Sequence, residues 1–334
     1  MRTRNAPDVS PAVNNSAEGP GTTTAVASPV KKPSSTRDAL AYLAFVFGVL
    51  MMYTSNQIPV HSPEDFAHMR TAGRLAANTL KFIEPHVVPG VHPMTLDDKI
   101  KHFVGKHDGA VAATLGYRGF KHSSCISPNE VVCHGVPSSQ LILKSGDIVN
   151  VDIAVKVNGW HGDISKTFYV GGEENVDDEG IRLVKETKRA LQLGLSQCKP
   201  YGRIGDIVAP IRQHLLQQNF TVVNRYAAHG LGQKFHQPPT IKHGSYKTKN
   251  TGFQLKPGYF FTVEPMANEG VEHTELDPTR NDQWTVVTTD RKRSAQFEHT
   301  IGVGKDGCEI FTSLLLAGKR HPSSRAFDDA IYDE

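Results

Sequence analysis

From Ser62 onward, hydrophobic positions recur at the spacing of an amphipathic helix. The sequence Ser-Pro-Glu-Asp at 62–65 supplies a capping serine, a proline in the first turn and nearby acids, so it predicts a helix start. Apolar or small side chains then form a helical stripe at Phe66, Met69, Gly73, Ala76, Leu80 and Ile83. Thr95-Leu96-Asp97-Asp98 repeats the capping pattern and predicts a second helix that runs to about His107.

Further along the chain, strand patterns and helical patterns follow in groups. Strand patterns occupy 147–157, 160–170, 259–266, 284–289 and 297–303, and helical patterns occupy 179–197 and 204–218. The order of two helices and a strand pair therefore occurs twice, which indicates a structural duplication, although the residues show no repeat. Strands grouped apart from helices predict an α+β fold with a mostly antiparallel sheet.

The first 56 residues contain two segments of different character. Residues 1–37 are rich in Ser, Thr, Pro, Ala and Asn without apolar periodicity, so they predict a disordered tail. Residues 38–56 include an uncharged run of 15 residues, Ala39 to Tyr53. A spanning helix usually needs about 20 apolar residues. Three interpretations fit this run: a signal anchor in a membrane, the hydrophobic part of an organelle-targeting presequence, or a helix packed on the domain that follows.

The charges around the apolar run do not determine the cellular compartment of the protein. Basic residues precede the run and acids follow it, so the positive-inside rule would carry the following domain across a membrane. A processed presequence or the opposite orientation would instead place that domain in the cytoplasm or in an organelle such as a mitochondrion or plastid. We therefore predict a targeting or anchor segment at 38–56, a folded domain at 62–318 and a C-terminal tail at 319–334.

Composition narrows the classes of function. The formal net charge of +3 is small for 334 residues, and no basic run is dense enough to follow a nucleic-acid backbone. The four cysteines, Cys125, Cys133, Cys198 and Cys308, match no zinc spacing and do not indicate a disulfide scaffold, which favours a reducing compartment. The 16 histidines are numerous and direct attention to metal binding.

The most informative segment surrounds Asn158-Gly159, which lies between two strand patterns. This dipeptide favours a two-residue hairpin turn because both turn positions need a positive φ. With that turn, Val157 pairs with Trp160, and Asp152 lies opposite Ser165. Asp163 is then diagonal to Asp152 on the same face, where such neighbours lie about 7–8 Å apart. The two carboxylates could therefore converge on shared cations.

The alternative interpretation of this pair is two acids that face solvent on an edge hairpin. Val151, Ile153 and Val155 instead indicate a well-buried strand. A carboxylate beside a buried strand is costly unless a cation compensates its charge, which favours the metal interpretation.

Three further segments carry candidate ligands. Ala-His-Gly-Leu-Gly at 228–232 places His229 in a glycine-rich loop, and His236 follows seven residues later. Glu264 lies near the end of an apolar strand pattern, and Glu298 lies in another. Taken singly, each fits an ordinary loop histidine or an acid that caps a neighbouring turn.

Together these segments, from about Ser62 to Thr312, resemble the methionine aminopeptidase family of the pita-bread fold. The family's ordered Asp-Asp-His-Glu-Glu ligands match Asp152, Asp163, His229, Glu264 and Glu298. The resemblance implies two divalent metal ions, with Asp152 on one, His229 and Glu264 on the other, and Asp163 and Glu298 bridging both. It also implies a pseudo-twofold fold whose duplicated helix-helix-strand halves surround a curved sheet.

Ligand chemistry agrees with this resemblance. Four carboxylates and one imidazole suit Mn²⁺, Fe²⁺ or Co²⁺ better than a thiolate-bound structural zinc, with catalytic Zn²⁺ compatible. Two such ions about 3.5–4 Å apart can share a bridging water, lower its pKa and polarise a carbonyl group. The resemblance therefore implies hydrolysis of the bond after an N-terminal methionine.

The resemblance also assigns catalytic histidines and a substrate pocket. Asn-Glu-Val-Val-Cys-His-Gly at 129–135 is similar to the family segment whose histidine contacts the substrate, so His134 would bind the scissile amide nitrogen. His236 would stabilise the oxyanion, and Glu298 would act as general base. The methionine pocket would be lined by Tyr117, Phe120, Cys125, Phe235 and Trp284. For Phe120 and Trp284, an ordinary core role is the alternative.

Departures from the family pattern concentrate in one loop. Gly-Tyr-His-Gly-Tyr-Pro is replaced by Gly-Tyr-Arg-Gly-Phe-Lys at 116–121, so Arg118 and Lys121 add positive charge and Phe120 lacks a hydroxyl. Thr114 occupies a position that is usually cysteine in bacterial relatives. These changes bear on substrate preference and inhibitor response and leave the metal ligands intact.

Spacing and partners complete the prediction. Glu264 follows His236 by only 28 positions, which leaves no room for the helical insertion of type II enzymes and favours type I. The resemblance implies a monomer that acts on the N-termini of nascent polypeptides with a small second residue, and the ribosome as a further candidate partner. The rival interpretations are a prolidase-like or Xaa-Pro aminopeptidase and a catalytically silent binding module of the same fold.

Overall fold

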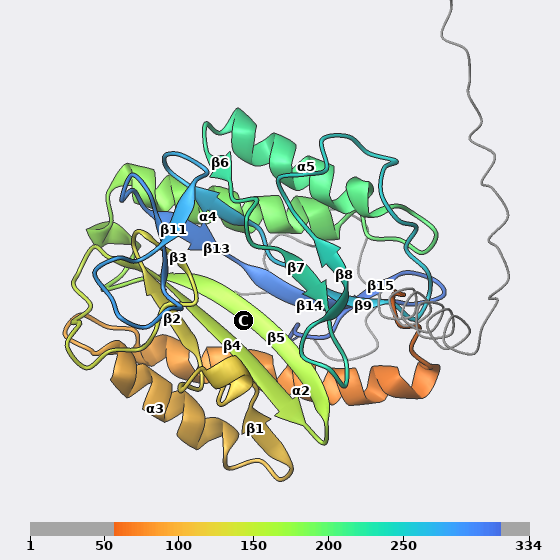
Figure 1. Ribbon diagram of the computed structural model, residues 1–334, viewed down its shortest axis with the longest axis horizontal. Helices are drawn as coiled ribbons and strands as arrows, with labels where there is room; N and C mark the ends of the chain where they lie inside the picture. The colour runs from red at the N-terminus through yellow and green to blue at the C-terminus, as the bar shows by residue number, and fades with distance from the viewer. Residues whose placement is uncertain (1–56, 315–334) are drawn as a thin grey trace, which may run out of the picture. The chain divides into compact units, whose positions relative to one another are not determined.

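The longest element of the sheet is the hairpin of strands β4 (Ile148–Val157) and β5 (Trp160–Tyr169), in a computed structural model that describes residues 57–314 (Figure 1). Asn158 and Gly159 have φ values of 48° and 88°, as the predicted two-residue turn requires. Val157 pairs with Trp160 and Asp152 pairs with Ser165, so the predicted register is confirmed.

Two helices cover this hairpin on one side, as Figure 1 shows: α2 (Pro63–Ile83) and α3 (Pro93–Val104). The apolar stripe of α2 is buried against β4 and β5 in one hydrophobic cluster. The predicted start of the second helix at Thr95 is two residues late. The helix begins at Pro93 because the fixed φ of proline suits the first helical position, with His92 as the cap.

The second half repeats this order with helices α4 (Asp178–Leu195) and α5 (Ile204–Gln217) and strands β9 (Phe260–Val263) and β14 (Glu298–Val303). These elements enclose a second hydrophobic cluster. The two halves meet where β5 pairs antiparallel with β14. The predicted helices are confirmed, whereas the strand predicted at 259–266 is broken after Val263.

All strand pairs between residues 57 and 314 are antiparallel, so the α+β prediction with a mostly antiparallel sheet is confirmed. The main sheet has the order β1-β4-β5-β14-β9-β7-β8, with β2 on β4 and β15 on β14. Its shorter strands are β1 (Ala110–Ala112), β2 (Cys125–Pro128), β7 (Ala228–Gly230), β8 (Gln237–Ile241) and β15 (Cys308–Ile310).

Two small sheets and three short 3₁₀ helices complete the described chain. The small sheets have the orders β13-β10-β6 and β11-β12-β3. Their strands are β3 (Val131–Cys133), β6 (Thr221–Val222), β10 (Met266–Asn268), β11 (Thr274–Leu276), β12 (Val286–Thr288) and β13 (Ser294–Gln296). The 3₁₀ helices are η1 (Glu84–His86), η2 (Tyr117–Gly119) and η3 (Glu173–Asn175). Strands of two or three residues are too short to show a pattern in the sequence.

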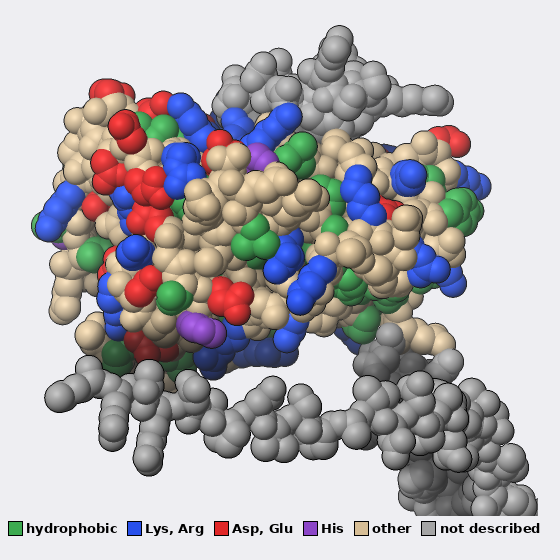
Figure 2. Space-filling model, turned by 90° about the horizontal axis from the view of Figure 1, so that it is seen from above, with side chains coloured by type: hydrophobic (Ala, Val, Ile, Leu, Met, Phe, Trp, Pro, Cys, Tyr) green, Lys and Arg blue, Asp and Glu red, His purple; other side chains and the backbone are tan. Residues whose placement is uncertain are grey.

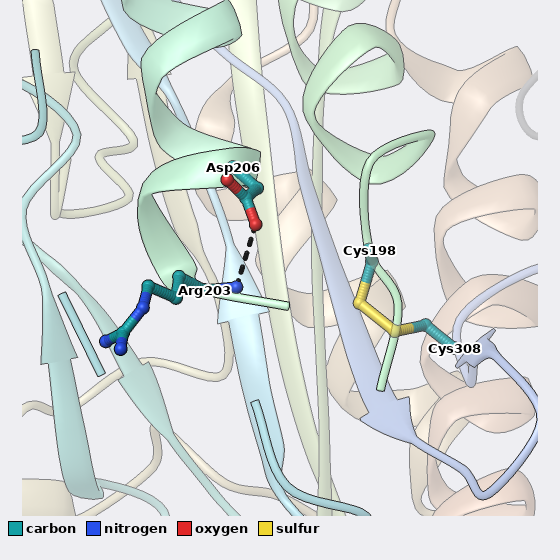
Figure 3. Close-up of a disulfide and its surroundings, with 4 residues drawn as sticks. All are labelled: Cys198, Arg203, Asp206 and Cys308. Carbon is teal, nitrogen blue, oxygen red and sulfur yellow. Dashed lines mark hydrogen bonds between the residues drawn. A yellow bond between two sulfur atoms is a disulfide. The ribbon is translucent and has the colours of Figure 1, made fainter. Parts of the chain in front are cut away.

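A disulfide joins Cys198, after α4, to Cys308 in β15 (Figure 3). Near it, the backbone N–H of Arg203 donates to Asp206 at 2.8 Å and caps α5. The cysteine pattern had not indicated a disulfide scaffold, and this one disulfide was not predicted. The two residues lie 110 positions apart, and only the fold brings their Cα atoms to 5.8 Å. Cys125 and Cys133 are buried free thiols.

Between residues 57 and 314, no helix combines the length and apolar character needed to cross a membrane. The predicted tail at 1–37, the apolar segment at 38–56 and the C-terminal tail at 319–334 lie outside the described residues. The face shown in Figure 2 carries Lys, Arg, Asp and Glu side chains interspersed, in keeping with the small net charge.

Candidate metal centre

A row of paired residues crosses four neighbouring strands of the main sheet. Cys125 on β2 pairs with Asp152 on β4, Asp152 pairs with Ser165 on β5, and Ser165 pairs with Glu298 on β14. Directly paired residues project to the same face of a sheet. The row therefore brings one acid from each half of the molecule to a common face.

Asp163 on β5 projects to the same face. It lies two residues from Ser165 and opposite Ala154, so it is diagonal to Asp152, as predicted. Thr300 fixes its backbone: the N–H of Asp163 donates to the Thr300 hydroxyl at 3.0 Å, and that hydroxyl lies 2.7 Å from the Asp163 carbonyl oxygen. The carboxylate oxygen Oδ1 of Asp163 is buried and has no hydrogen-bond partner in the described part of the chain.

His229 approaches from strand β7. Its ring atom Nδ1 lies 3.1 Å from the carbonyl oxygen of Gly230, which only accepts, so Nδ1 carries the proton. The free lone pair of Nε2 is then available, 3.6 Å from Asp163 Oδ2 and 4.0 Å from Glu264 Oε1. This tautomer is the one that presents a nitrogen donor to a metal ion.

Glu264 directly follows strand β9, and Glu298 begins β14. Their neighbours Val263 and His299 are paired, so the two acids lie at the same end of adjacent strands. The Thr262 hydroxyl donates to Glu264 Oε1 at 2.7 Å and accepts the backbone N–H of His229 at 3.0 Å. One hydroxyl group thus positions two candidate ligands.

Electrostatics at this face favour a bound cation. Burial, followed by repulsion from neighbouring acids, raises the pKa of Asp152 and of Glu298 well above the ordinary range. Burial also raises the pKa of Glu264 to about 7. For His229, burial lowers the pKa, but the interactions with Asp163 and Glu264 outweigh it and leave the pKa raised. Closely packed acids of this kind are costly unless a cation neutralises them.

The donor set fits divalent metal ions. Donor atoms of Asp163, His229 and Glu298 lie within 4.8 Å of one another, and Glu264 adjoins His229. The unpartnered Oδ1 of Asp163 and the oxygen-rich composition match hard or borderline cations. The structure therefore brings together all five predicted ligand residues: Asp152, Asp163, His229, Glu264 and Glu298.

His134 lies beyond the end of β3 in a left-handed conformation, with φ of 55°. The following residue must be glycine, because a Cβ on Gly135 would collide with the carbonyl oxygen of Ile126. The His134 ring lies edge-on to two aromatic rings, that of Tyr226 at 5.6 Å and that of Trp284 at 6.4 Å. Burial lowers its pKa, and the charge of Asp163 partly opposes that shift.

His236 stands next to the candidate ligands, with its ring 3.9 Å from that of His229. On its other side it stacks on Tyr117 at 5.0 Å. Partial burial, followed by the neighbouring charges of His229 and Arg118, lowers the pKa of His236 to about 3. Both predicted catalytic histidines thus flank the acidic face.

The predicted pocket residues form two aromatic pairs beside the histidines. Tyr117 lies 4.9 Å from Phe235, and Phe120 lies 5.2 Å from Trp284. The buried thiol of Cys125 lies beside Asp152 in the row described above. Trp284 in turn lies 6.4 Å from His134, so the pair of Phe120 and Trp284 adjoins a predicted catalytic histidine.

Sequence reasoning missed the polar residues that support the candidate ligands. Besides Thr262, Gln296 donates its side-chain amide to Glu264 at 3.2 Å. A signal was present: each supporting residue lies two positions from an acid on an otherwise apolar strand, and so on the same face. The residues that follow this rule are Asn150, Ser165, Thr262, Gln296 and Thr300. His161, which stacks on Phe235 at 5.4 Å, was also missed.

The chain was compared with known protein families and curated sequences. The profile of metallopeptidase family M24 matches residues 67–305. The methionine aminopeptidase of Rickettsia prowazekii is 46% identical over 255 residues, which cover 76% of this chain and 95% of that protein. The methionine aminopeptidase of Escherichia coli strain K12 is also 46% identical, over 76% of this chain and 94% of its own length.

Solved structures give the same result. The crystal structure of the Rickettsia prowazekii enzyme matches with a TM-score of 0.72 over 77% of this chain and all of that chain. Methionine aminopeptidase from Thermotoga maritima matches at 34% identity and a TM-score of 0.72, over 77% of this chain and 99% of its own. Prolidase from Pyrococcus furiosus, at 16% identity and a TM-score of 0.58, shares the fold alone.

These matches confirm the predicted pita-bread fold and the use of divalent metal in the family. The type II helical insertion is absent, because residues 236–264 contain strands β8 and β9 and no helix. We conclude that the chain belongs to the methionine aminopeptidases of metallopeptidase family M24.

Proposed function

We propose that this chain hydrolyses the peptide bond after an N-terminal methionine. The observation that carries the proposal is the meeting of five acidic and imidazole donors on one face, bordered by two histidines and an aromatic pocket. The relatives at 46% identity, both methionine aminopeptidases, support the same activity.

The donor arrangement supports two divalent ions. Asp152 would hold one ion, His229 and Glu264 would hold the other, and Asp163 and Glu298, which come from opposite halves, would bridge them. Mn²⁺, Fe²⁺ and Co²⁺ suit these donors, and Zn²⁺ is compatible with them. Bound ions of this class lower the pKa of water and polarise a carbonyl group.

Three side chains would move or hold protons around the scissile bond. Glu298 would accept the proton of the attacking water. His134 would bind the amide nitrogen of the leaving chain. His236 has a pKa of about 3, so it is neutral near pH 7 and can donate one ring N–H to the developing oxyanion.

The pocket explains the choice of methionine. Tyr117, Phe120, Phe235 and Trp284 offer aromatic surface, and Cys125 adds a buried sulfur. A flexible thioether gains about 0.3–1.5 kcal/mol from each favourable sulfur–aromatic contact. We propose that the second substrate residue must be small, that the natural substrates are N-termini of nascent polypeptides, and that the chain acts as a monomer.

Metal removal and restoration test the proposal. The purified chain is stripped with chelator and assayed on Met-Ala-Ser and on Ala-Pro peptides, before and after addition of Mn²⁺, Fe²⁺, Co²⁺ or Zn²⁺. We expect methionine release to disappear and then return, with Ala-Pro peptides uncut. Restored cleavage of Ala-Pro without methionine release would favour a prolidase-like activity, and no restored cleavage of either peptide would contradict both.

A further inference from the structure

Exposed cations border the aromatic side chains of the pocket. In three places an inward aromatic residue is directly adjacent in sequence to an exposed cation: Tyr117–Arg118, Phe120–Lys121 and Lys234–Phe235. The pocket is apolar within, and its border is positively charged. A substrate that enters N-terminus first therefore extends its later residues toward these cations.

Arg118 is connected to the candidate site through an aromatic contact. Its guanidinium lies 5.4 Å from the ring of Tyr117, which stacks on His236 at 5.0 Å. Gly116, Arg118 and Gly119 all have positive φ, at 85°, 49° and 90°. The backbone therefore reverses direction around Arg118, and this exposed side chain lies over the ring of Tyr117.

The distance from Arg118 to the metal centre corresponds to a few peptide residues. The chain of contacts runs from Arg118 through Tyr117 to His236, and the His236 ring lies 3.9 Å from that of His229. An extended peptide advances about 3.3–3.6 Å per residue. The third to fifth residues of a polypeptide whose first bond lies at the metal centre would thus reach Arg118.

The cations at this border form no ion pair with the part of the chain that the structure describes. No carboxylate between residues 57 and 314 forms an ion pair with Arg118, Lys121 or Lys234. By contrast, Arg293 is held by both Asp177 and Glu269. Three cations are few for a nucleic-acid surface, which commonly uses about 6–10 phosphate contacts. A carboxylate on the peptide substrate matches them better.

We propose that Arg118 binds an acidic side chain at the third, fourth or fifth residue of the substrate. This preference rests on the proposed removal of N-terminal methionine. Lys121 and Lys234 add to the positive electrostatic potential around Arg118 without contacting the substrate directly. The substrate class is therefore polypeptides with methionine first, a small residue second and an acid shortly after. Arg118 is a specificity-determining residue and takes no part in bond cleavage.

Paired peptides test this assignment on the full, metal-supplemented chain. Amidated Met-Ala-Ser-Asp-Gly-Gly is compared with its Asn counterpart, and the Asp/Asn exchange is repeated at positions three and five. For exposed pairs worth about 0.2–1 kcal/mol, we expect the acid to raise kcat/KM by up to about fivefold at low salt. The ratio should approach one in 1 M NaCl, where the screening length is about 3 Å.

Variants locate the effect. Arg118→Gln should bring the Asp-to-Asn ratio to about one, and Arg118→Glu should reverse it. Lys305→Gln is the matched control, because this exposed cation lies beyond the far end of β14 from Glu298. That strand places it roughly 20 Å from the site at about 3.3 Å per residue. Its ratio should equal that of the unaltered chain.

Each alternative result contradicts the proposal in its own way. A ratio of one at every position in the unaltered chain, or a ratio that persists in Arg118→Gln, would overturn the role of Arg118. Inhibition by oligouridylate that Arg118→Glu abolishes, together with a flat peptide ratio, would assign the border to RNA. Absence of methionine release from every peptide would overturn the proposed function itself, and cleavage of the Asn peptides separates the two failures.

Discussion

The two halves of the molecule bring their acids together by different means. In the first half, β4 and β5 are joined by a two-residue turn, and hairpin register alone places Asp152 and Asp163 on one face. In the second half, β9 and β14 are separated by residues 264–297, which build parts of both small sheets. Supporting side chains hold Glu264 there, through the Thr262 hydroxyl and the Gln296 amide.

This difference indicates two kinds of vulnerability. The first half depends on a backbone conformation that a single turn enforces. The second half depends on side-chain hydrogen bonds, because strands that are distant in sequence do not fix a carboxylate by themselves. The metal ions are the element that both halves share, so loss of a bridging acid should affect both halves equally.

Replacement of a bridging acid should have the largest effect. Asp163→Asn and Glu298→Gln, one from each half, should each lower kcat/KM at least about 1,000-fold, because each weakens the hold on both ions. Steady-state kinetics together with metal content per chain would measure this. Asp147→Asn, an acid at the start of the same hairpin whose side chain bonds Lys144 and Asn129, is the control. Full activity of Asp163→Asn would rule out its bridging role.

The stability of the metal-free chain should depend on pH more strongly than that of the loaded chain. Glu264 has a folded pKa of about 7, above its ordinary value of 4.5, and the pKa values of Asp152 and Glu298 are raised as well. A raised pKa contributes stability below pH 4.5, and this contribution is lost as pH rises through the folded value. For Glu264 the loss is on the order of 3 kcal/mol.

Chemical unfolding from pH 5 to pH 8, with and without bound metal, measures this dependence. The difference in unfolding free energy between loaded and metal-free chain should grow with pH. Comparison of the two forms cancels the opposite contribution of His243, which is buried, has a lowered pKa and lies outside the metal centre. If the difference in unfolding free energy between the two forms stayed constant from pH 5 to pH 8, the raised pKa values of the acids at the metal centre would be contradicted.

Loss of support in the second half should have an intermediate effect. Thr262→Val removes the hydroxyl that holds both Glu264 and His229, so metal affinity or kcat/KM should fall about 10- to 100-fold. The control is Thr79→Val, which removes an equally buried hydroxyl bonded only to Leu75 within α2. Equal metal affinity in the two variants would show that Thr262 has no role at the centre.

The smallest effect concerns the turn of the first half. Gly159→Ala adds a Cβ that meets no neighbouring atom, at a residue with φ of 88°. Its cost therefore comes from backbone strain alone. We expect a loss of about 1 kcal/mol in unfolding free energy. Gly307→Ala, also in open space but without a positive φ, should change stability by less than about 0.5 kcal/mol. Urea unfolding of both variants measures the two losses in unfolding free energy. Equal losses would mean that the positive φ at Gly159 does not contribute to stability.

The same contrast explains what could be predicted from the sequence. Asn158-Gly159 fixed a register, so the convergence of Asp152 and Asp163 followed from local rules. No local rule relates Glu264 to Glu298, and only the family resemblance grouped them. The support by Thr262 and Gln296 was visible as a two-residue spacing, but it became interpretable only when the strands were adjacent.

Two further differences had separate causes, one in packing and one in a competing local signal. His134 adopts a left-handed conformation next to Gly135, which packs against the Ile126 carbonyl oxygen of strand β2. The sequence pattern did not reveal this contact. The start of α3 was misplaced because Pro93, two residues before the capping-like Thr95, already favours the first helical position.

The bond between Cys198 and Cys308 encloses the donors of the second half in a covalent ring. His229, Glu264 and Glu298 all lie between these cysteines, whereas Asp152 and Asp163 lie outside. A ring of about 100 residues restricts the unfolded chain by about 4.7 kcal/mol in the chain-entropy treatment. In an oxidising environment the unfolded second half would therefore search fewer conformations before its three donors meet again. The redox state of the surroundings would thus act on one half of the metal site more than on the other.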